Sequence, residues 1–366
     1  MVGVDDVINK LSTVIDPDIK KDIVSMGMIK DLELDSGNLK FTLELTTPAC
    51  PFNEEIESDV RKAIDELDGI NNLDMKVTAK VTEGRPVSQD EFLKNVKNVI
   101  AVASGKGGVG KSTVALNLAL ALSKTGAKVG LLDADIYGPS IPLMLGTKGP
   151  LEATEDMKIK PVESNGIKVV SFGFFGEQPK QAAIFRGPIL SNLLKQYFIQ
   201  GTIWGELDYL IVDLPPGTGD IPLTLAQEVP ITGIVIVTTP QEVASNVAVK
   251  ALGMFEKLNV PMLGVVENMS HFECSKCSEI HYIFGTGGAQ KISEKHNIPF
   301  LGEIPLNSGI MEGSDLGKPV IITQPNSPSA EAFTAAAKNI AAQCSIAAAK
   351  LQEEAEAEAE APPTPS

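Results

Sequence analysis

Long apolar runs, disulfide-forming cysteines and an excess of positive charge are all missing from this sequence. No apolar run approaches the roughly 18 residues that a membrane-spanning helix requires. Only four cysteines occur in 366 residues, which excludes a disulfide framework in a chain this long. Lysine and arginine number 31 against 47 aspartates and glutamates, for a formal net charge of -16. Phosphate backbones select clustered basic residues, so we expect neither nucleic acid nor membrane among the partners.

The amino terminus also lacks the basic start of a secretory signal peptide, since it reads MVGVDD. We therefore expect a cytoplasmic protein. Its four cysteines, Cys50, Cys274, Cys277 and Cys344, are then candidates for metal or thiol chemistry.

A chain of 366 residues has room for two domains. Residues 1–83 predict a small α+β domain. Its helices are expected near 4–14 and 54–67, and period-two alternation predicts strands at 39–45 and 75–81.

A larger nucleotide-binding domain is predicted over 96–346, after a linker over 84–95 that contains GRPVS. Here continuous apolar strands alternate with helices, which predicts an α/β fold with a mostly parallel sheet and helices on both faces. Ligands of such sheets bind beyond the carboxyl ends of the strands. The predicted strands are 99–103, 129–132, 209–212, 233–237 and 262–266.

The carboxyl-terminal segment 347–366 carries a glutamate–alanine repeat followed by PPTPS. This low-complexity composition predicts a frayed helix end that runs into disorder.

A phosphate-binding loop, SGKGGVGKST over residues 104–113, follows the strand 99–103 and precedes an apolar helical stretch. The glycines let successive backbone N–H groups converge on phosphate oxygens, Lys111 brings a cation to the outer phosphates, and Ser112 offers a hydroxyl to Mg²⁺. The loop therefore predicts that this chain binds a nucleoside triphosphate. The predicted contacts are Gly105, Lys106, Gly107, Gly108, Val109, Gly110, Lys111, Ser112 and Thr113.

Two of the predicted strands end in aspartates. The strand 209–212 runs into Asp213 and a loop reading LPPGTGD, which is typical of a magnesium-holding carboxylate followed by a switch loop. The strand 129–132 runs into Asp133 and Asp135. Together with the phosphate loop, these carboxylates predict a phosphoryl-transfer site.

The pattern GKGGVGKST resembles the deviant Walker A motif of the P-loop NTPase family that includes nitrogenase iron protein, MinD and ParA. The resemblance implies that Lys106 reaches the nucleotide of a partner subunit in a homodimer, so Lys106 joins Lys111, Asp135 and Asp213 as a catalytic candidate. It implies that Asp133 supports magnesium and that Asp135 orients the attacking water. It also assigns Asn268 to the adenine.

A C-x-x-C pair, Cys274 and Cys277, follows the last of these strands. Two thiolates cannot close a tetrahedral metal site, whereas two facing copies supply the four thiolates of a bridging [4Fe-4S] cluster. Three other readings remain open: a zinc site completed by His271 and His281, a redox dithiol, and an inert pair.

At this point the sequence closely resembles the Mrp-type (ApbC-like) iron-sulfur cluster carrier ATPases, over about residues 96 to 346. The resemblance implies a homodimer that holds a cluster, takes it from cluster donors and transfers it to apoproteins. Ser278 stands where this family often has glycine, and Phe185 where it often has tryptophan. The motifs that carry the resemblance are the phosphate loop, DADIYGPSIP (133–142), RGP (186–188), DLPPGTGD (213–220), TTPQ (238–241), ENMS (267–270) and the cysteine pair with HYIFG (281–285).

Residues 1–83 resemble the PaaD-like or SufT-like domain of iron-sulfur assembly proteins, through Asp16-Pro17 and the TTPACP motif around Cys50. Because Cys50 precedes a predicted helix, the positive helix terminus favours a reactive thiolate there, while a buried structural cysteine remains the alternative.

Two rival functions use the same predicted fold. A positioning ATPase of the MinD or ParA kind requires a basic, amphipathic carboxyl-terminal helix or a basic face. This chain instead carries glutamates in its carboxyl-terminal segment. An ATP-gated electron donor like nitrogenase iron protein has cluster cysteines far apart in sequence, not in one C-x-x-C.

Overall fold

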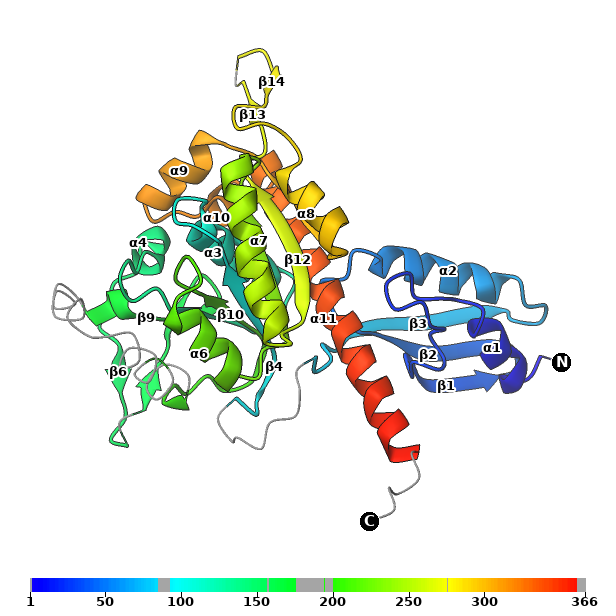
Figure 1. Ribbon diagram of the computed structural model, residues 1–366. Helices are drawn as coiled ribbons and strands as arrows, with labels where there is room; N and C mark the ends of the chain where they lie inside the picture. Colours follow the sequence, from blue (N-terminus) through cyan, green and yellow to red (C-terminus); the bar gives the residue numbers. More distant parts are fainter. Residues whose placement is uncertain are drawn as a thin grey trace. The chain divides into compact units, whose positions relative to one another are not determined.

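The structure is a computed structural model that describes residues 2–84, 93–156, 158–175, 194, 200–274 and 276–360. Contacts divide the chain into two compact units: residues 1–84 with 341–366, and residues 85–340 (Figure 1). Most of the predicted linker and the RGP motif with Phe185 lie outside the described residues.

The amino-terminal unit contains a three-stranded sheet in the order β1-β2-β3, with β1 antiparallel and β3 parallel to β2. The two predicted helices and two predicted strands are confirmed. The strand β1 was missed because its burial does not alternate regularly and a bulge interrupts its pairing between Lys30 and Glu33. The elements are α1 (Val4–Leu11), β1 (Ile29–Asp35), β2 (Asn38–Leu45), α2 (Asn53–Asp65) and β3 (Asn72–Ala79).

An eight-stranded sheet forms the centre of the larger unit, in the order β15-β12-β11-β4-β10-β5-β9-β8. All its pairings are parallel except that of β8 with β9. The five strands predicted from apolar runs are confirmed, so the predicted α/β fold is correct. The strands are β4 (Val96–Ala103), β5 (Val129–Asp133), β8 (Val162–Ser164), β9 (Ile167–Ser171), β10 (Leu207–Asp213), β11 (Gly233–Thr238), β12 (Met262–Asn268) and β15 (Phe300–Ile304).

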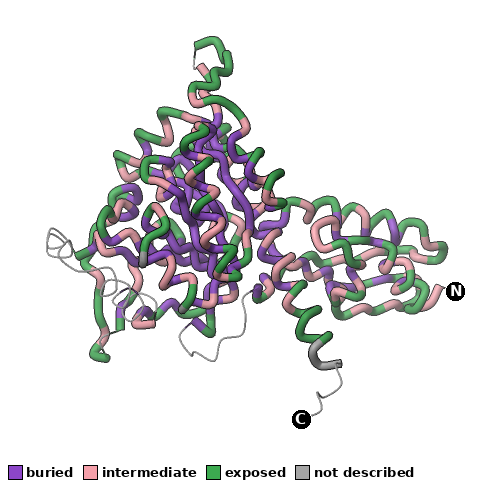
Figure 2. Tube along the Cα trace, in the orientation of Figure 1, coloured by how far each residue is buried: buried purple, intermediate pink, exposed green. Residues whose placement is uncertain are grey.

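Helices cover both faces of this sheet. Parallel strands are joined by right-handed crossovers, so connections that run in opposite directions along the sheet place their helices on opposite faces. Figure 1 shows α7 in front of the sheet and α3 behind it. Figure 2 shows that the strands between them are buried. The helices are α3 (Lys111–Lys124), α4 (Ile141–Leu145), α6 (Asp220–Glu228), α7 (Glu242–Lys257), α8 (Gly288–His296), α9 (Ser308–Asp315) and α10 (Val320–Thr323).

Short elements decorate the larger unit. The most important is the two-stranded hairpin of β13 and β14, which carries the cysteine pair and projects beyond the carboxyl ends of the parallel strands (Figure 1). These elements are β6 (Glu152–Ala153), β7 (Ile159–Lys160), the 3-10 helix η1 (Phe172–Phe175), β13 (Phe272–Glu273) and β14 (Ile280–His281).

The last helix, α11 (Pro328–Glu360), continues through much of the segment predicted to be disordered. Glutamate and alanine are good helix formers, which explains the continuation. Its part after residue 340 belongs to the amino-terminal unit, where Glu353 pairs with Lys21 at 2.7 Å, an exposed and therefore weak ion pair. Residues 361–366 lie outside the described residues. Across the described parts of the chain, no helix is long and apolar enough to cross a membrane.

Candidate functional site

The phosphate loop joins the carboxyl end of β4 to the first turn of α3, as predicted. Gly110 has φ 78° and immediately precedes the helix, a left-handed conformation that favours glycine, and the side chain of Asn268 leaves no room for a Cβ there. The first N–H groups of α3 have no intrahelical partners and therefore point into the loop. This geometry suits a polyphosphate.

A cavity of about 580 Å³ opens over the loop. Its walls include seven of the nine loop residues predicted to contact the nucleotide, and Asp135 and Asn268 as well; Gly105 and Val109 lie outside the lining. Gly105 is buried, and a Cβ there would clash with the backbone of Val247 in α7. The loop residues in the lining are Lys106, Gly107, Gly108, Gly110, Lys111, Ser112 and Thr113.

Lys111 and Asp213 form a buried ion pair at the base of the loop, with side-chain exposures of 6% and 0%. Lys111 Nζ also lies 3.2 Å from the Ser112 hydroxyl. Burial raises the pKa of Asp213, and the charge of Lys111 opposes this effect. The second carboxylate oxygen, Asp213 Oδ2, is buried and accepts no hydrogen bond from the described residues.

The unpaired oxygen Asp213 Oδ2 is a candidate ligand for magnesium. A buried, unpaired carboxylate oxygen is costly unless something coordinates it, and carboxylate and hydroxyl oxygens are the ligands that Mg²⁺ prefers. Asp213 Oδ2 and the Ser112 hydroxyl therefore fit a magnesium ion brought by the nucleotide.

Asp133, at the end of β5, is fully buried, and other groups of the protein donate hydrogen bonds to its carboxylate. Its carboxylate accepts hydrogen bonds from Ser171 Oγ at 2.8 Å, from Asp135 N at 3.2 Å and from Ile141 N at 3.4 Å. Burial raises its pKa to about 7, and the nearby Asp213 adds to the shift. Asp133 thus holds the loop after β5 in place and does not line the cavity, whereas Asp135 does.

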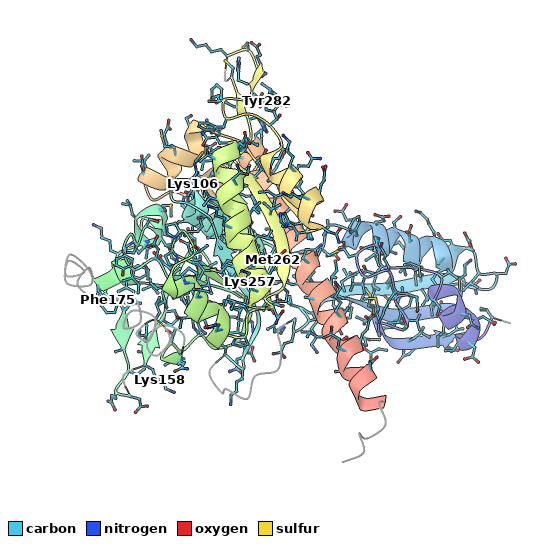
Figure 3. All side chains as sticks on the ribbon, in the orientation of Figure 1. Lys106, Lys158, Phe175, Lys257, Met262 and Tyr282 are labelled. Carbon is cyan, nitrogen blue, oxygen red and sulfur yellow. The ribbon has the colours of Figure 1, made fainter. Side chains whose placement is uncertain are left out.

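Lys106 is half-buried and lines the cavity. Within the part of the chain that the structure describes, it takes part in no ion pair. Figure 3 labels it on the loop beside α7. Its charge is therefore not paired with an acidic side chain among the described residues.

The far wall of the cavity was missed by sequence analysis. It comes from α4, which begins at the end of the DADIYGPSIP motif, and from the segment after β15, which is distant in the chain and has none of the quoted motifs. The added lining residues are Ser140, Leu143, Met144, Pro216, Met269, Pro305, Leu306, Asn307, Ile310, Met311, Ser314 and Asp315, together with Ser104 at the start of the loop.

Cys274 and Cys277 lie at the tip of the β13–β14 hairpin, half-buried and exposed respectively. The strands pair Phe272 with His281, and the turn is closed by hydrogen bonds from Cys274 N to Glu279 O at 3.0 Å and from Ser278 N to Cys274 O at 2.8 Å. Backbone N–H groups of Lys276 and Cys277 point at the Cys274 sulfur and lower its pKa. The turn is thus built to hold a thiolate.

The two histidines of the alternative zinc site, His271 and His281, contact other side chains. His271 Nδ1 lies 2.9 Å from Ser270 Oγ, and His281 packs beside Phe272 with ring centroids 6.4 Å apart. No group of three or more histidine, cysteine or acidic side chains able to hold a metal occurs among the described residues. Among the described residues, the hairpin therefore offers Cys274 and Cys277 as a pair of candidate ligands.

The other two cysteines are buried. Cys50 donates to Asp18 Oδ2 at 3.2 Å, and burial raises its pKa to about 12, despite the backbone N–H of Phe52. The expected activation by the helix terminus is wrong, because α2 begins at Asn53 and desolvation dominates. Burial also raises the pKa of Cys344.

Comparison with known proteins agrees with this geometry. A ParA model described as the NUBPL iron-transfer P-loop NTPase matches residues 95–341, and a model described as iron-sulfur cluster assembly protein matches residues 4–77. The chain is 48% identical over 353 residues to the iron-sulfur cluster carrier protein of Synechocystis sp., covering 95% of this chain and 99% of that one.

Solved structures give the same fold. A nucleotide-binding protein from Archaeoglobus fulgidus in complex with ADP is 42% identical, with a TM-score of 0.57 over 66% of this chain and 93% of that one. The cell division ATPase MinD of Pyrococcus furiosus, 24% identical with a TM-score of 0.51 over 66% of this chain and 98% of that one, shares the fold alone. The chain belongs to the iron-transfer P-loop NTPase family, with an iron-sulfur cluster assembly domain at its amino terminus.

Proposed function

We propose that this protein is an ATP-dependent iron-sulfur cluster carrier, which receives a cluster from a donor protein and transfers it to apoproteins. The observation that carries the proposal is the exposed C-x-x-C turn, whose Cys274 has a lowered pKa, on a hairpin that continues from the nucleotide pocket. An exposed thiolate pair can exchange its cargo, whereas buried ligands retain theirs. The names of the relatives, which are cluster carrier proteins, support this function.

The nucleotide chemistry is assigned to the buried pair and its neighbours. Lys111 neutralises charge on the outer phosphates, while Asp213 and Ser112 hold Mg²⁺, which supplies charge stabilisation at the phosphates. Asp135, which lines the cavity, orients the attacking water. Asp133 fixes Asp135 through the hydrogen bond to its backbone N–H. Asn268 recognises the adenine.

The cargo is a [4Fe-4S] cluster shared by two copies of the chain. Each hairpin offers two thiolates, and such a cluster takes four. A two-fold homodimer therefore completes the site. The same arrangement gives Lys106, which has no ion-pair partner among the described residues, the nucleotide of the partner subunit as its counter-charge.

Anaerobic reconstitution with iron and sulfide tests this function. The expected product is a dimer with about four iron and four sulfide and a broad visible charge-transfer absorption. The opposing outcome is about one zinc per monomer, lost on changing His271 or His281 and lacking visible absorption. That outcome would leave a structural zinc site on an ATPase.

A further inference from the structure

Four consecutive residues, 267–270, lie between the nucleotide pocket and the cysteine hairpin. They comprise the end of β12 and the two residues after it. The inner two, Asn268 and Met269, line the pocket, while the outer two, Glu267 and Ser270, are buried to within 1% and 2% exposure. Buried polar side chains at this point need partners, and their partners identify what the segment holds.

The inner residues are fixed against the phosphate loop. Asn268 Nδ2 donates to the carbonyl of Val109 at 2.8 Å. Met269 has φ 55°, a left-handed conformation that a methionine rarely adopts and that the surrounding structure must impose. A nucleotide that displaces either residue therefore moves a segment with little freedom to adjust locally.

Ser270 anchors the beginning of the hairpin. Its N–H and hydroxyl both reach the carbonyl of Ile304, at 3.0 and 3.2 Å, and its Oγ lies 2.9 Å from His271 Nδ1. With the hydroxyl proton directed at Ile304, the imidazole Nδ1–H is the donor to Ser270 Oγ. Leu306, itself in the pocket wall, donates its N–H to the carbonyl of His271 at 2.7 Å. The first residues of the hairpin are thus bonded to a segment that lines the pocket.

Glu267 holds the start of α8, the helix that follows the hairpin. Its carboxylate accepts the N–H of Ala289 at 2.7 Å, and backbone N–H groups of Gly287 and Gly288 also point at it. These residues form the start of α8, which residues 282–287 separate from the end of the hairpin at His281. A carboxylate at a helix amino terminus gives charge-assisted hydrogen bonds, which are roughly twice as strong as neutral ones.

We propose that residues 267–270 couple nucleotide occupancy to the position of the cysteine pair, with Ser270 and Glu267 as the positioning residues that hold the segments before and after the hairpin. The proposal rests on the proposed function, since it explains how ATP acts on the cargo. The inner residues sense the nucleotide, and the outer residues carry the displacement to the segment that enters β13 and to the start of α8 beyond β14. Only three residues lie between Ser270 and Cys274, so the path to the cysteine pair is short.

Coupling between two sites is a free energy, measured as the factor by which one ligand changes the affinity for the other. We would titrate the full-length protein anaerobically with Co²⁺, reading thiolate-to-cobalt absorption, with and without saturating Mg-ADP. The wild type is expected to show a change in cobalt affinity of about fivefold or more. By linkage, cobalt must change ADP affinity by the same factor.

Ser270→Ala is expected to reduce this factor to less than about twofold, below the usual range of coupling, while ADP affinity without cobalt stays near that of the wild type. Ser270→Thr, which keeps a hydroxyl, is expected to restore part of the coupling. The matched control is Ser293→Ala, which removes a hydroxyl bonded to the carbonyl of Ile298 at 2.6 Å in α8, away from the pocket. Should Ser270→Ala not fold, Glu267→Gln weakens the other anchor and is expected to lower the coupling in the same way.

Two results would overturn the inference: wild-type cobalt affinity that ignores Mg-ADP, or Ser270→Ala and Glu267→Gln with coupling equal to that of the control. Either result leaves the carrier function intact if reconstitution still yields the iron-sulfur cluster. A wild type that takes up no cluster contradicts the proposed function instead, whatever the cobalt coupling.

Discussion

The nucleotide pocket and the cysteine hairpin belong to the same compact unit but differ in how complete each is within one chain. In the pocket, Lys111 and Asp213 are buried, and a cavity of about 580 Å³ lies over them. The hairpin projects from the unit, with Cys277 exposed and no group of three or more metal-binding side chains among the described residues. Figure 3 shows Tyr282 on this projecting hairpin, where it is 55% exposed.

The difference follows from what each site must do. Phosphoryl transfer requires charges that are fixed in place before the nucleotide arrives, and burial makes those charges effective. Transfer of a cluster requires ligands that another protein can reach and that let go. Under the proposed function, a site of the second kind is incomplete in one chain, and assembly of two copies would complete it.

The largest expected effect lies in the pocket. Lys111→Ala and Asp213→Asn each remove one member of the buried pair, and we expect Mg-ATP hydrolysis to fall by at least about 100-fold. Breaking a buried pair also destabilises the fold by roughly 3–5 kcal/mol, so activity must be expressed per folded protein, measured by circular dichroism. Lys257→Ala, an exposed lysine at the end of α7, is the control. Near-normal turnover in both pocket variants would mean that hydrolysis occurs elsewhere.

Cys277→Ser addresses the cysteine hairpin. A shared site loses two of its four thiolates through one substitution, so we expect cluster content to fall from about four iron per dimer to near none. Cys50→Ala, a buried cysteine of the amino-terminal unit, is expected to keep it. If Cys50→Ala lost the cluster equally, the cysteine pair would not be the sole holder. ATP binding by the cluster-free proteins should be unchanged in both, since the residues that line the pocket are untouched.

Lys106→Ala tests whether the pocket too depends on a second chain. Because Lys106 has no ion-pair partner among the described residues of its own subunit, we expect hydrolysis to fall at least about tenfold. We expect nucleotide affinity, measured by fluorescence titration, to change by less than about threefold, roughly 0.7 kcal/mol. Equal losses of hydrolysis and of nucleotide affinity would indicate that Lys106 acts within one subunit. The pocket would then be complete in one chain, unlike the hairpin.

The smallest effect concerns the thiols. At pH 8 we expect iodoacetamide to label the hairpin cysteines rapidly and Cys50 slowly, since its raised pKa keeps it protonated and burial hides it. Peptide mass spectrometry after timed quenching measures this. Rapid labelling of Cys50 in the folded protein would contradict its burial.

The same thiol contributes a pH dependence of stability. In the folded state the pKa of Cys50 is about 12, above the ordinary value of 9.0. Above pH 9 the unfolded chain releases this proton while the folded chain retains it, so stability falls as pH rises from about 9 toward 12. Cys50→Ala should flatten this part of the urea-unfolding profile.

The sequence by itself determined the features whose chemistry is local. The phosphate loop, the aspartates at strand ends and the C-x-x-C turn each lie within a few residues, where spacing along the chain fixes spacing in the structure. Buried parallel strands were readable for a similar reason, because burial on both faces leaves a continuous apolar run. The strand β1 was not readable, since it is half exposed and bulged.

Only the tertiary structure decided the far wall of the pocket, the burial of Cys50 and the partners of Glu267 and Ser270. Leu306 meets His271, and Glu267 meets Ala289, through contacts between elements that no local pattern joins. Desolvation of Cys50 is likewise set by what the whole unit packs around it, which outweighs the nearby helix terminus that the sequence did reveal. Local motifs therefore identified the two sites, while packing across the sheet determined their surroundings and the bonds that connect them.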